Sequence, residues 1–306
     1  MIYSSNIYCM PRTEFRIIPP FNFDLSIKFC ERTKFDVLDR NDKYCLKRFT
    51  KIDNTPVFIE IGCGGTADKP VGLAKWSYPE GGQIDENRIS ATAGKILSAD
   101  IDLKPFYRKL DQSAKLKPLK KNLYGLKPIL TATVFESAAW AIIGQQVNLT
   151  FATRTKIRLE KRYGKSIKTG GNQFFLFPDP GKIAGIRVTT LRNMQFSQRK
   201  AEYLIGLAKI CTKENDFFES LSNSPYNKAI EKLTAVRGIG IWSANYLLMR
   251  GVGHLNCLPL GDTGLTRATK EVYNMRKKPD NDKIEKLARR FEPYRSLYTL
   301  YLWFSL

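Results

Sequence analysis

Residues 233–267 read LTAVRGIGIWSANYLLMRGVGHLNCLPLGDTGLTR, and this stretch is the most informative part of the chain. Gly238 and Gly240 flank a single isoleucine, and a run with helical character follows from Ile241 to Arg250. Two glycines at this spacing allow a sharp turn and leave backbone N–H groups unobstructed at a helix N-terminus. Such a row of N–H groups binds phosphate. The stretch therefore predicts a phosphate-binding hairpin between two helices.

One carboxylate follows this hairpin. Asp262 lies in the segment Pro-Leu-Gly-Asp-Thr-Gly, where a loop can project the side chain away from a helix face. Taken alone, a Gly-x-Gly turn is more often an ordinary helix cap, and a loop aspartate is more often a turn residue. The order helix, hairpin, helix and glycine-flanked aspartate is much more specific. It indicates a phosphate-gripping turn coupled to a carboxylate that takes part in chemistry.

The charge of the chain predicts a polyanionic partner. Among 306 residues, 50 are Lys or Arg and 29 are Asp or Glu, which gives a net charge of +21. Nucleic acid is the leading candidate, and an anionic membrane surface is the rival. No polybasic run borders an apolar helix, and no segment approaches the roughly 20 apolar residues of a membrane span. The first residues, MIYSSNIYCMPRTEFR, lack the pattern of a secretory signal. We therefore expect a cytoplasmic, nucleoid-associated protein with no membrane partner.

The cysteine and histidine pattern argues against a metal-dependent enzyme. The six cysteines form no Cys-x-x-Cys pair, which disfavours a zinc site or an iron–sulfur cluster. A single histidine, His254, removes most histidine-dependent triads from consideration. We expect reduced cytoplasmic thiols and no required cofactor. The cysteines are Cys9, Cys30, Cys45, Cys63, Cys211 and Cys257.

Two compositional regimes divide the chain and predict an α+β fold. Before about residue 90 the sequence indicates a small antiparallel sheet with one or two helices, because apolar and polar residues alternate in short runs. The expected strands cover Phe21–Ile27, Tyr44–Phe49, Val57–Ile61 and Val71–Tyr78, separated by Asp-Asn and glycine-rich turns. After Ile96 the pattern becomes helical. We place a β-rich N-terminal domain at 1–112 and an all-α domain at 113–306.

Helix boundaries are predicted from capping and breaking residues. Residues 135–163 indicate two helices interrupted at 144–146 and closed by Gly164. The segment 177–180, Phe-Pro-Asp-Pro, breaks the chain ahead of another helix. Ser197 is expected to cap the next helix, and Asn281 is expected to cap a late one.

Five blocks occur in one order along the chain: FESAAWAIIGQQV at 135–147, FPDP at 177–180, SQRKAEYLIGLA at 197–208, the hairpin with its aspartate loop at 233–267, and PYRSLYTLYLW at 293–303. This order resembles the type II 3-methyladenine DNA glycosylases of the helix-hairpin-helix DNA glycosylase superfamily. Residues 21–61 also look like the N-terminal β domain of that family. The resemblance implies a helical domain in two lobes, with the DNA cleft and the base pocket between them.

The resemblance implies a catalytic role for Asp262. An enzyme that cuts the bond between base and sugar must flip the nucleotide out of the duplex. Cleavage builds positive charge on the sugar, and a fixed carboxylate stabilises that transition state. Asp262 matches the catalytic aspartate of the family, and activation of a water molecule is a second duty open to it.

Three aromatic residues match pocket positions of the family. Trp242, Tyr246 and Trp303 would hold a flat, electron-poor base by stacking and cation–π contacts. Trp242 and Tyr246 are four residues apart and share a helix face. The alternative is that all three are ordinary core aromatics. Relatives that also cut the strand carry a lysine nucleophile where this chain has Trp242. We therefore expect a monofunctional enzyme that uses water and leaves an abasic site.

The resemblance also assigns the contacts with double-stranded damaged DNA, and we expect the protein to be a monomer. Gln146 stands where a well-known bacterial member places an apolar wedge, and Arg237 replaces the usual hairpin proline. Relatives hold an alkali ion at the hairpin, which implies Na⁺ or K⁺ on the backbone carbonyls of Thr234, Val236 and Gly238. The expected DNA-binding residues are Gln145, Gln146, Arg237, Gly238, Gly240, Ser243 and Asn245.

Three functions remain open from the sequence. The first is excision of alkylated purines such as 3-methyladenine. The second keeps the chemistry but acts on deaminated or oxidised bases such as hypoxanthine or 8-oxoguanine. The third is a helix-hairpin-helix protein that binds damaged DNA without catalysis. Asp262 in its loop, together with Trp242 and Tyr246, disfavours the third function.

Overall fold

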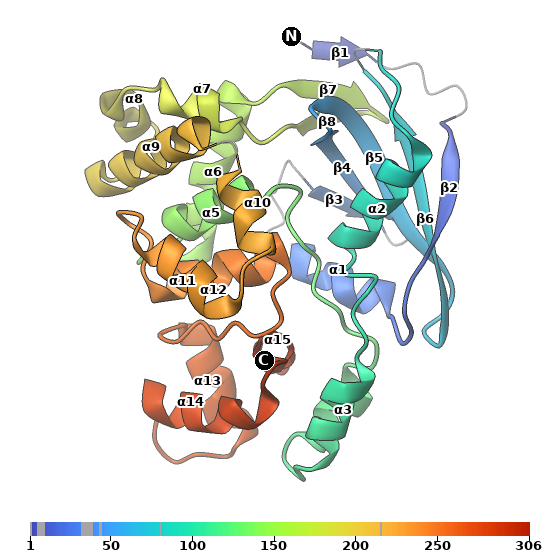
Figure 1. Ribbon diagram of the computed structural model, residues 1–306, viewed down its shortest axis with the longest axis vertical. Coiled ribbons are helices and arrows are strands. Elements are labelled where there is room, and N and C mark those ends of the chain that lie inside the picture. The colour runs from blue at the N-terminus through green and yellow to red at the C-terminus, as the bar shows by residue number, and fades with distance from the viewer. Residues whose placement is uncertain (1, 5–9, 32–38, 43–44, 80, 215) are drawn as a thin grey trace.

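The computed structural model describes residues 2–4, 10–31, 39–42, 45–79, 81–214 and 216–306. An antiparallel sheet from the first part of the chain lies on one side of the molecule, and the later helices lie on the other side (Figure 1). The predicted α+β class is confirmed. No described helix is long and apolar enough to cross a membrane.

A five-stranded antiparallel sheet forms the N-terminal part, with the strand order β2-β6-β5-β4-β3. The Asp53–Asn54 turn joins β4 to β5, and both residues adopt the left-handed conformation that a tight hairpin turn requires, with φ 47° and 65°. Three of the strands cover the predicted runs, except that Tyr78 lies just beyond β6 and Tyr44 lies outside the described residues. The strands are β2 Arg12–Arg16, β3 Asp39–Asp42, β4 Cys45–Ile52, β5 Thr55–Thr66 and β6 Lys69–Ser77.

The strand predicted at Phe21–Ile27 is wrong, because this segment begins helix α1, Phe23–Glu31. The side chain of Asn22 accepts a hydrogen bond from the backbone N–H of Leu25 at 2.9 Å, which caps the helix. Phe23 and Ile27 are buried at helical spacing, while Asp24 between them is exposed in the first turn. A cap and a 3.6-residue period therefore override the apparent alternation.

Two helices cover the sheet and close a separate small core. Helix α2, Glu86–Ile96, packs with α1 and the strands around Ile59, Ile61 and Trp76. Ile129, which lies much later in the sequence, also belongs to this cluster. The sheet therefore has an apolar core of its own.

The helical region also contains a β-hairpin, so it is not all-α. Strands β7 Ser166–Thr169 and β8 Asn172–Phe175 pair across Gly170 and Gly171, which have φ values of 54° and 73°. Strand β1, Ile2–Ser4, pairs in parallel with β7. The ring of Phe174 meets that of Phe58 in β5 at 4.9 Å, so the hairpin fastens the helical region to the sheet.

The first group of helices contains the predicted break and caps. Helix α5 ends at Ile143 and α6 begins at Leu149, as the residues around 144–146 predicted. Ser197 caps α9 by accepting from the N–H of Lys200. Gly164 follows α6 with φ −78°, and it is needed because a Cβ there would lie 2.2 Å from the carbonyl oxygen of Leu176. The group comprises α5 Val134–Ile143, α6 Leu149–Tyr163, α7 Pro180–Ala184, α8 Val188–Asn193, α9 Gln198–Lys213, α10 Phe217–Ser222, α11 Tyr226–Thr234, α12 Ile241–Leu247 and the π-helical turn η1 Leu248–Val252.

A second group combines late helices with α3, which lies near them in space (Figure 1). Phe106 of α3 packs edge-on against Tyr301 of α15 at 4.9 Å. The predicted boundary at 112/113 stays a prediction, although this contact places α3 on the helical side. Asp280, rather than Asn281, caps α14, and its side chain accepts from the N–H of Lys283. The group comprises α3 Lys104–Asp111, α4 Lys117–Asn122, α13 Thr263–Val272, α14 Asn281–Ala288, the 3₁₀ turn η2 Arg289–Phe291 and α15 Arg295–Trp303.

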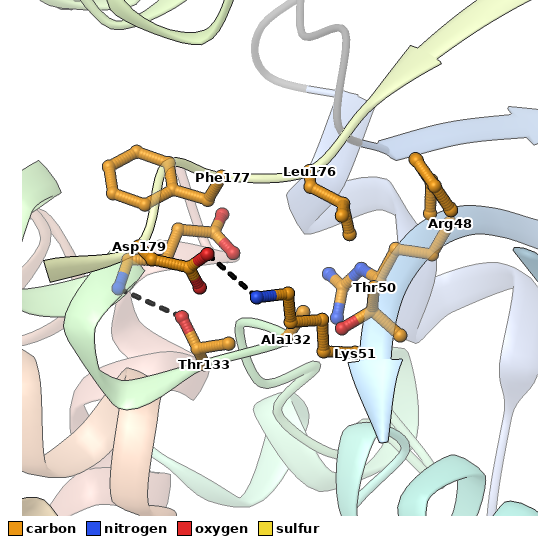
Figure 2. A pocket seen from close by; sticks show the side chains of 10 residues that line it. Arg48, Thr50, Lys51, Ala132, Thr133, Leu176, Phe177 and Asp179 are labelled. Carbon is orange, nitrogen blue, oxygen red and sulfur yellow. Dashed lines mark hydrogen bonds and ion pairs between the residues drawn. The ribbon is translucent and has the colours of Figure 1, made fainter. Parts of the chain in front are cut away.

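Two side chains of β4 connect the sheet to the helices. Figure 2 shows Lys51 reaching Asp179 of the Phe-Pro-Asp-Pro segment, with Nζ and Oδ2 2.6 Å apart. Both groups are partly exposed, so this pair adds little stability. Arg48, which is 2% exposed, donates from Nη1 to the carbonyl of Leu130 at 2.9 Å. A buried cation of the sheet is therefore fixed at the junction.

Lys127 is a second buried cation at this junction. Its Nζ donates to the carbonyl oxygens of Ile18 and Ala99 at 2.7 and 3.2 Å. Burial lowers the pKa of the Lys127 amine to about 8, although Asp100 and Asp102 oppose that effect. The folded protein therefore favours the neutral amine more than the unfolded chain does.

We predict that the difference in the free energy of unfolding between the wild type and Lys127→Met changes in favour of the wild type by about 1–2 kcal/mol between pH 7.5 and 9.5. In this window the folded protein loses the Lys127 proton while the unfolded chain keeps it. Denaturant unfolding at both pH values measures the difference. Lys117→Met, at an exposed lysine, should show no such trend. A constant difference for Lys127→Met would contradict the account.

Candidate active site

A cavity of about 440 Å³ lies where the helices meet α1 and β4. It receives side chains from α1, β4, α5, α6, α12, η1, α13 and α15, so distant parts of the sequence converge on it. The predicted residues Trp242, Tyr246, Asp262 and Trp303 all line it. The other lining residues are Phe29, Cys30, Arg48, Thr131, Glu136, Trp140, Gly144, Val147, Asn148, Leu149, Ala152, Lys156, Arg250, Thr263 and Gly264.

Asp262 caps the N-terminus of α13 at the wall of this cavity. Its Oδ1 accepts a hydrogen bond from the backbone N–H of Leu265 at 2.7 Å. Gly261 precedes it with φ 86°, a conformation that favours glycine, and so turns the chain into the helix. The loop predicted from the glycine-flanked aspartate is therefore present, and it fixes the carboxylate at the positive end of a helix.

Two indole N–H groups also hold the Asp262 carboxylate. Nε1 of Trp242 donates to Oδ2 at 3.2 Å, and Nε1 of Trp303 donates to Oδ1 at 3.0 Å. Gly264 allows this approach, because a Cβ there would lie 3.1 Å from Oδ1 and 3.4 Å from the Trp303 ring. Both indoles therefore orient the carboxylate in addition to offering aromatic surface.

Aromatic rings form much of the cavity wall. Trp242 and Tyr246 stack with centroids 5.5 Å apart and an interplanar angle of 24°, as their four-residue spacing predicted. Trp303 lies 6.1 Å from Phe29 of α1, which the sequence did not identify. Trp242 and Tyr246 are partly exposed and line the cavity, whereas Trp303 is 7% exposed and belongs to the hydrophobic core while it also lines the cavity.

The hairpin between α11 and α12 has the predicted geometry. Gly238 adopts φ 92°, and a Cβ there would lie 2.2 Å from the ring of Tyr203. Gly240 is exposed, serves as the N-cap of α12 and has open space where a Cβ would lie. No side chain caps α12. Its first N–H groups can therefore serve an anion.

Gln145 attaches this hairpin to the end of α5. Its Nε2 donates to the carbonyl of Gly238 at 2.8 Å and to Oγ of Ser243 at 3.0 Å. The Gln145 amide nitrogen is therefore used within the protein, and the expected contact of Gln145 with DNA stays a prediction. Gln146, by contrast, is exposed and adopts φ 52°.

Ser243 and Asn245 are not presented to a ligand. They are 3% and 1% exposed, so the expected contacts of their side chains with DNA are not supported. Asn245 accepts from the hydroxyl of Tyr226 and from the N–H of Leu258, both at 2.8 Å. Its amide ties the start of α12 to the chain leading to Asp262.

Arg237 is exposed beside the hairpin but already has partners. Its Nη2 pairs with Glu202 at 3.1 Å, and the guanidinium lies 5.5 Å from the Tyr203 ring centroid. This position beside the hairpin is consistent with the expected role of Arg237 in DNA binding. The ion pair with Glu202 partly offsets that charge.

A cluster of charged side chains, which the sequence did not predict, borders the same cavity as the aromatic rings. Lys156 of α6 pairs with Glu136 at 3.4 Å and with Glu160 at 3.1 Å, and all three are buried. Arg48 and Arg250 line the same space. Helical periodicity indicates which residues are buried, but it does not indicate which buried charges meet across helices.

The carbonyls expected to bind an alkali ion lie at the turn between α11 and α12. The Val236 carbonyl accepts from the N–H of Ile239 at 3.0 Å, and the Gly238 carbonyl accepts from Gln145. Thr234 belongs to the last turn of α11. A carbonyl oxygen has two lone pairs, so these groups retain the capacity to bind a cation. The described residues include no group of three or more His, Cys, Asp or Glu suited to a metal ion.

Comparisons with known proteins identify the family of the chain. A family model described as HhH-GPD superfamily base excision DNA repair protein matches residues 139–293. The chain is 34% identical over 204 residues to a DNA-3-methyladenine glycosylase of Bacillus subtilis, with 67% of each protein covered. It is 28% identical over 247 residues to a DNA-3-methyladenine glycosylase of Saccharomyces cerevisiae, covering 71% of this chain and 80% of that protein. A solved 3-methyladenine DNA glycosylase from Archaeoglobus fulgidus matches with a TM-score of 0.83 and 25% identity, covering 95% of this chain and 97% of that one.

Gly238→Ala and Gly240→Ala form a matched pair that tests the hairpin. We predict that Gly238→Ala destabilises the protein by about 1–3 kcal/mol, because it strains a left-handed residue and drives a methyl group into Tyr203. Gly240→Ala should change stability by less than about 0.5 kcal/mol. Denaturant unfolding measures both variants. Equal losses would contradict the geometry of the turn.

Proposed function

Since this chain belongs to the HhH-GPD superfamily of base excision DNA repair proteins and is a DNA glycosylase for alkylated bases, we propose that it excises purines of the 3-methyladenine type by hydrolysis. The product is an abasic site in an uncut strand. The observation that carries the proposal is the Asp262 carboxylate, fixed by two indoles and a helix N-terminus at the wall of a cavity of about 440 Å³.

Asp262 acts on the sugar. Departure of the base leaves positive charge on the deoxyribose, and a carboxylate beside that charge stabilises it more in the transition state than in the ground state. The two indole donors hold the carboxylate in place before the substrate enters, so little reorganisation is needed during the reaction. An alkylated purine already carries positive charge and leaves readily, which removes the need for a strong general acid.

The aromatic wall holds the base. A cavity of this size accepts one flipped nucleobase, and the stacked Trp242 and Tyr246 rings offer it a flat, electron-rich face. A cationic base is attracted to such a face by the ring quadrupole. Trp303 both binds Asp262 and borders the cavity, so it connects base recognition to the carboxylate.

Water is the nucleophile in this proposal, because the described residues around the cavity offer no amine for covalent attack. Trp242 has no nucleophilic atom. Among the described residues that line the cavity, Lys156 is the only lysine, and two buried glutamates hold its amine. An amine held as an ammonium ion between carboxylates does not attack a sugar. Asp262 is placed to activate water once the base has left.

The hairpin and the net charge of +21 hold the DNA. The N–H groups at the start of α12 face a backbone phosphate, with Gly238 and Gly240 forming the turn. The exposed Gln146, in the turn between α5 and α6, would fill the gap left by the flipped nucleotide. Ser243 and Asn245 support this surface from within.

An alkali ion at the hairpin completes the proposal. Na⁺ or K⁺ on the carbonyls of Thr234, Val236 and Gly238 would add positive charge beside the phosphate. We predict that replacing potassium with choline at equal ionic strength weakens binding to an abasic duplex. Fluorescence anisotropy measures the affinity, and circular dichroism checks that the helices persist. Equal affinities in the two salts would contradict this prediction.

We predict that Asp262→Asn lowers the single-turnover rate of alkylated-base release by about 10²–10³-fold. Asparagine keeps the cap of α13 but loses the negative charge. The matched control is Asp280→Asn at the N-cap of α14, which lies outside the residues lining the cavity and should act within about twofold of wild type. Release of free base from single-lesion duplexes measures the rates.

Borohydride treatment during the same reaction tests the hydrolytic route. We expect no covalent protein–DNA adduct, because a Schiff base requires an attacking amine. A trapped adduct would contradict the use of water. Full activity of Asp262→Asn would contradict the role of the carboxylate.

A further inference from the structure

Arg250 is a buried cation whose position the proposed mechanism does not use. It is 6% exposed and lines the cavity, yet its Nε and Nη1 atoms have no hydrogen-bond partner among the residues that the structure describes. Leaving such donors unsatisfied costs free energy, so a buried arginine in this state calls for an explanation. Both atoms have less than 1 Å² of accessible surface, so an acceptor on a bound base reaches them only when the guanidinium turns toward the cavity that Arg250 lines.

Helix geometry directs Arg250 to the same wall as the aromatic pair. Trp242, Tyr246 and Arg250 follow one another at four-residue steps. In an α-helix of about 3.6 residues per turn, four residues make slightly more than one full turn, so each successive side chain points in a slightly rotated direction. A π-helix has more than four residues per turn. Four residues within the π-helical turn at Leu248–Val252 therefore make slightly less than one full turn, and the side chain is rotated in the opposite direction. The turn therefore helps to keep Arg250 in line with the two rings.

Local packing fixes this turn. Gly251 follows Arg250, and a Cβ there would lie 2.8 Å from Cβ of Ser137 in α5, so the π-helical turn lies directly against that helix. The backbone carbonyl of Arg250 accepts from the N–H of Thr131 at 2.9 Å. The Arg250 guanidinium lies over the ring of Phe29, 3.9 Å from its centroid. These contacts place the guanidinium beside Phe29, which also lines the cavity.

A continuous wall connects Asp262 to Arg250. The carboxylate binds Trp303, the Trp303 ring lies 6.1 Å from Phe29, and Phe29 carries the guanidinium. The glycosidic bond of a bound nucleotide must lie at Asp262. In a purine, positions 1 and 6 lie across the ring system from the glycosidic nitrogen. A purine seated with its glycosidic bond at Asp262 and its six-membered ring toward Arg250 would bring position 6 near the guanidinium.

We propose that Arg250 is a specificity-determining residue that donates hydrogen bonds to the 6-oxo oxygen of the flipped purine. A guanidinium has only donors, so it matches the carbonyl of guanine-type or hypoxanthine-type bases and not the amino group of adenine-type bases. Its charge also opposes binding of a cationic base, and the oxygen contact offsets this repulsion for 6-oxo purines. Arg250 therefore raises excision of 6-oxo lesions relative to 6-amino lesions. This inference rests on the glycosylase function proposed above.

Methylated DNA provides an internal comparison. DNA treated with N-methyl-N-nitrosourea carries both 3-methylguanine and 3-methyladenine, which share the alkylated position but differ at position 6. Chromatography of the released bases gives the ratio of their excision rates in one reaction. Losses of folding or of DNA binding affect both bases and cancel in this ratio.

We expect Arg250→Met to lower the ratio of 3-methylguanine to 3-methyladenine release by about tenfold. Arg250→Lys, which keeps the charge without the planar fork, should lower the ratio less and covers the case in which the methionine variant fails to fold. Arg276→Met, at an exposed arginine, should leave the ratio unchanged. An unchanged ratio in the Arg250 variants would overturn the proposal. Failure of the wild type to release either base would instead overturn the proposed function.

Discussion

The structure depends on one constraint, which is that the Asp262 carboxylate must accept two indole N–H groups and a backbone N–H at once. Trp242 comes from α12, Trp303 from α15, and the backbone donor from the start of α13. Three helices therefore meet at one side chain. Gly261 and Gly264 are explained by the same constraint, because one turns the chain and the other leaves room for the Trp303 ring. The carboxylate is preorganised by the fold rather than by the substrate.

Helix α12 connects the proposed DNA-binding hairpin to the cavity that Asp262 lines. Its N-terminus has no side-chain cap and is the proposed phosphate site, and its next turns carry Trp242 and Tyr246 into the cavity. Gln145 fastens this N-terminus to α5 through the Gly238 carbonyl, and the buried Asn245 fastens it to the chain before Asp262. A bound phosphate is therefore at a fixed distance from the carboxylate. A contact with the DNA backbone would therefore determine where the sugar lies relative to Asp262.

The sequence predicted the parts that depend on local spacing. The hairpin glycines, the aspartate loop and the stacked pair at positions 242 and 246 follow from turn geometry and helical periodicity. The sequence did not predict the parts of the structure that depend on tertiary contacts. Residues 21–27 alternate like a strand, but the Asn22 cap makes them helical, and that helix brings Phe29 to the cavity. Arg250 could have been noticed as the next four-residue step after Tyr246. The meeting of Lys156 with Glu136 across two helices has no local signal.

The central claim is that Asp262 stabilises positive charge on the sugar. The most direct measurement compares the affinities of wild type and Asp262→Asn for two abasic duplexes, one with a cationic pyrrolidine at the lesion and one with neutral tetrahydrofuran. The account predicts that the wild type binds the cationic duplex at least about tenfold more tightly and that the variant loses this preference. An equal preference in both proteins would contradict it.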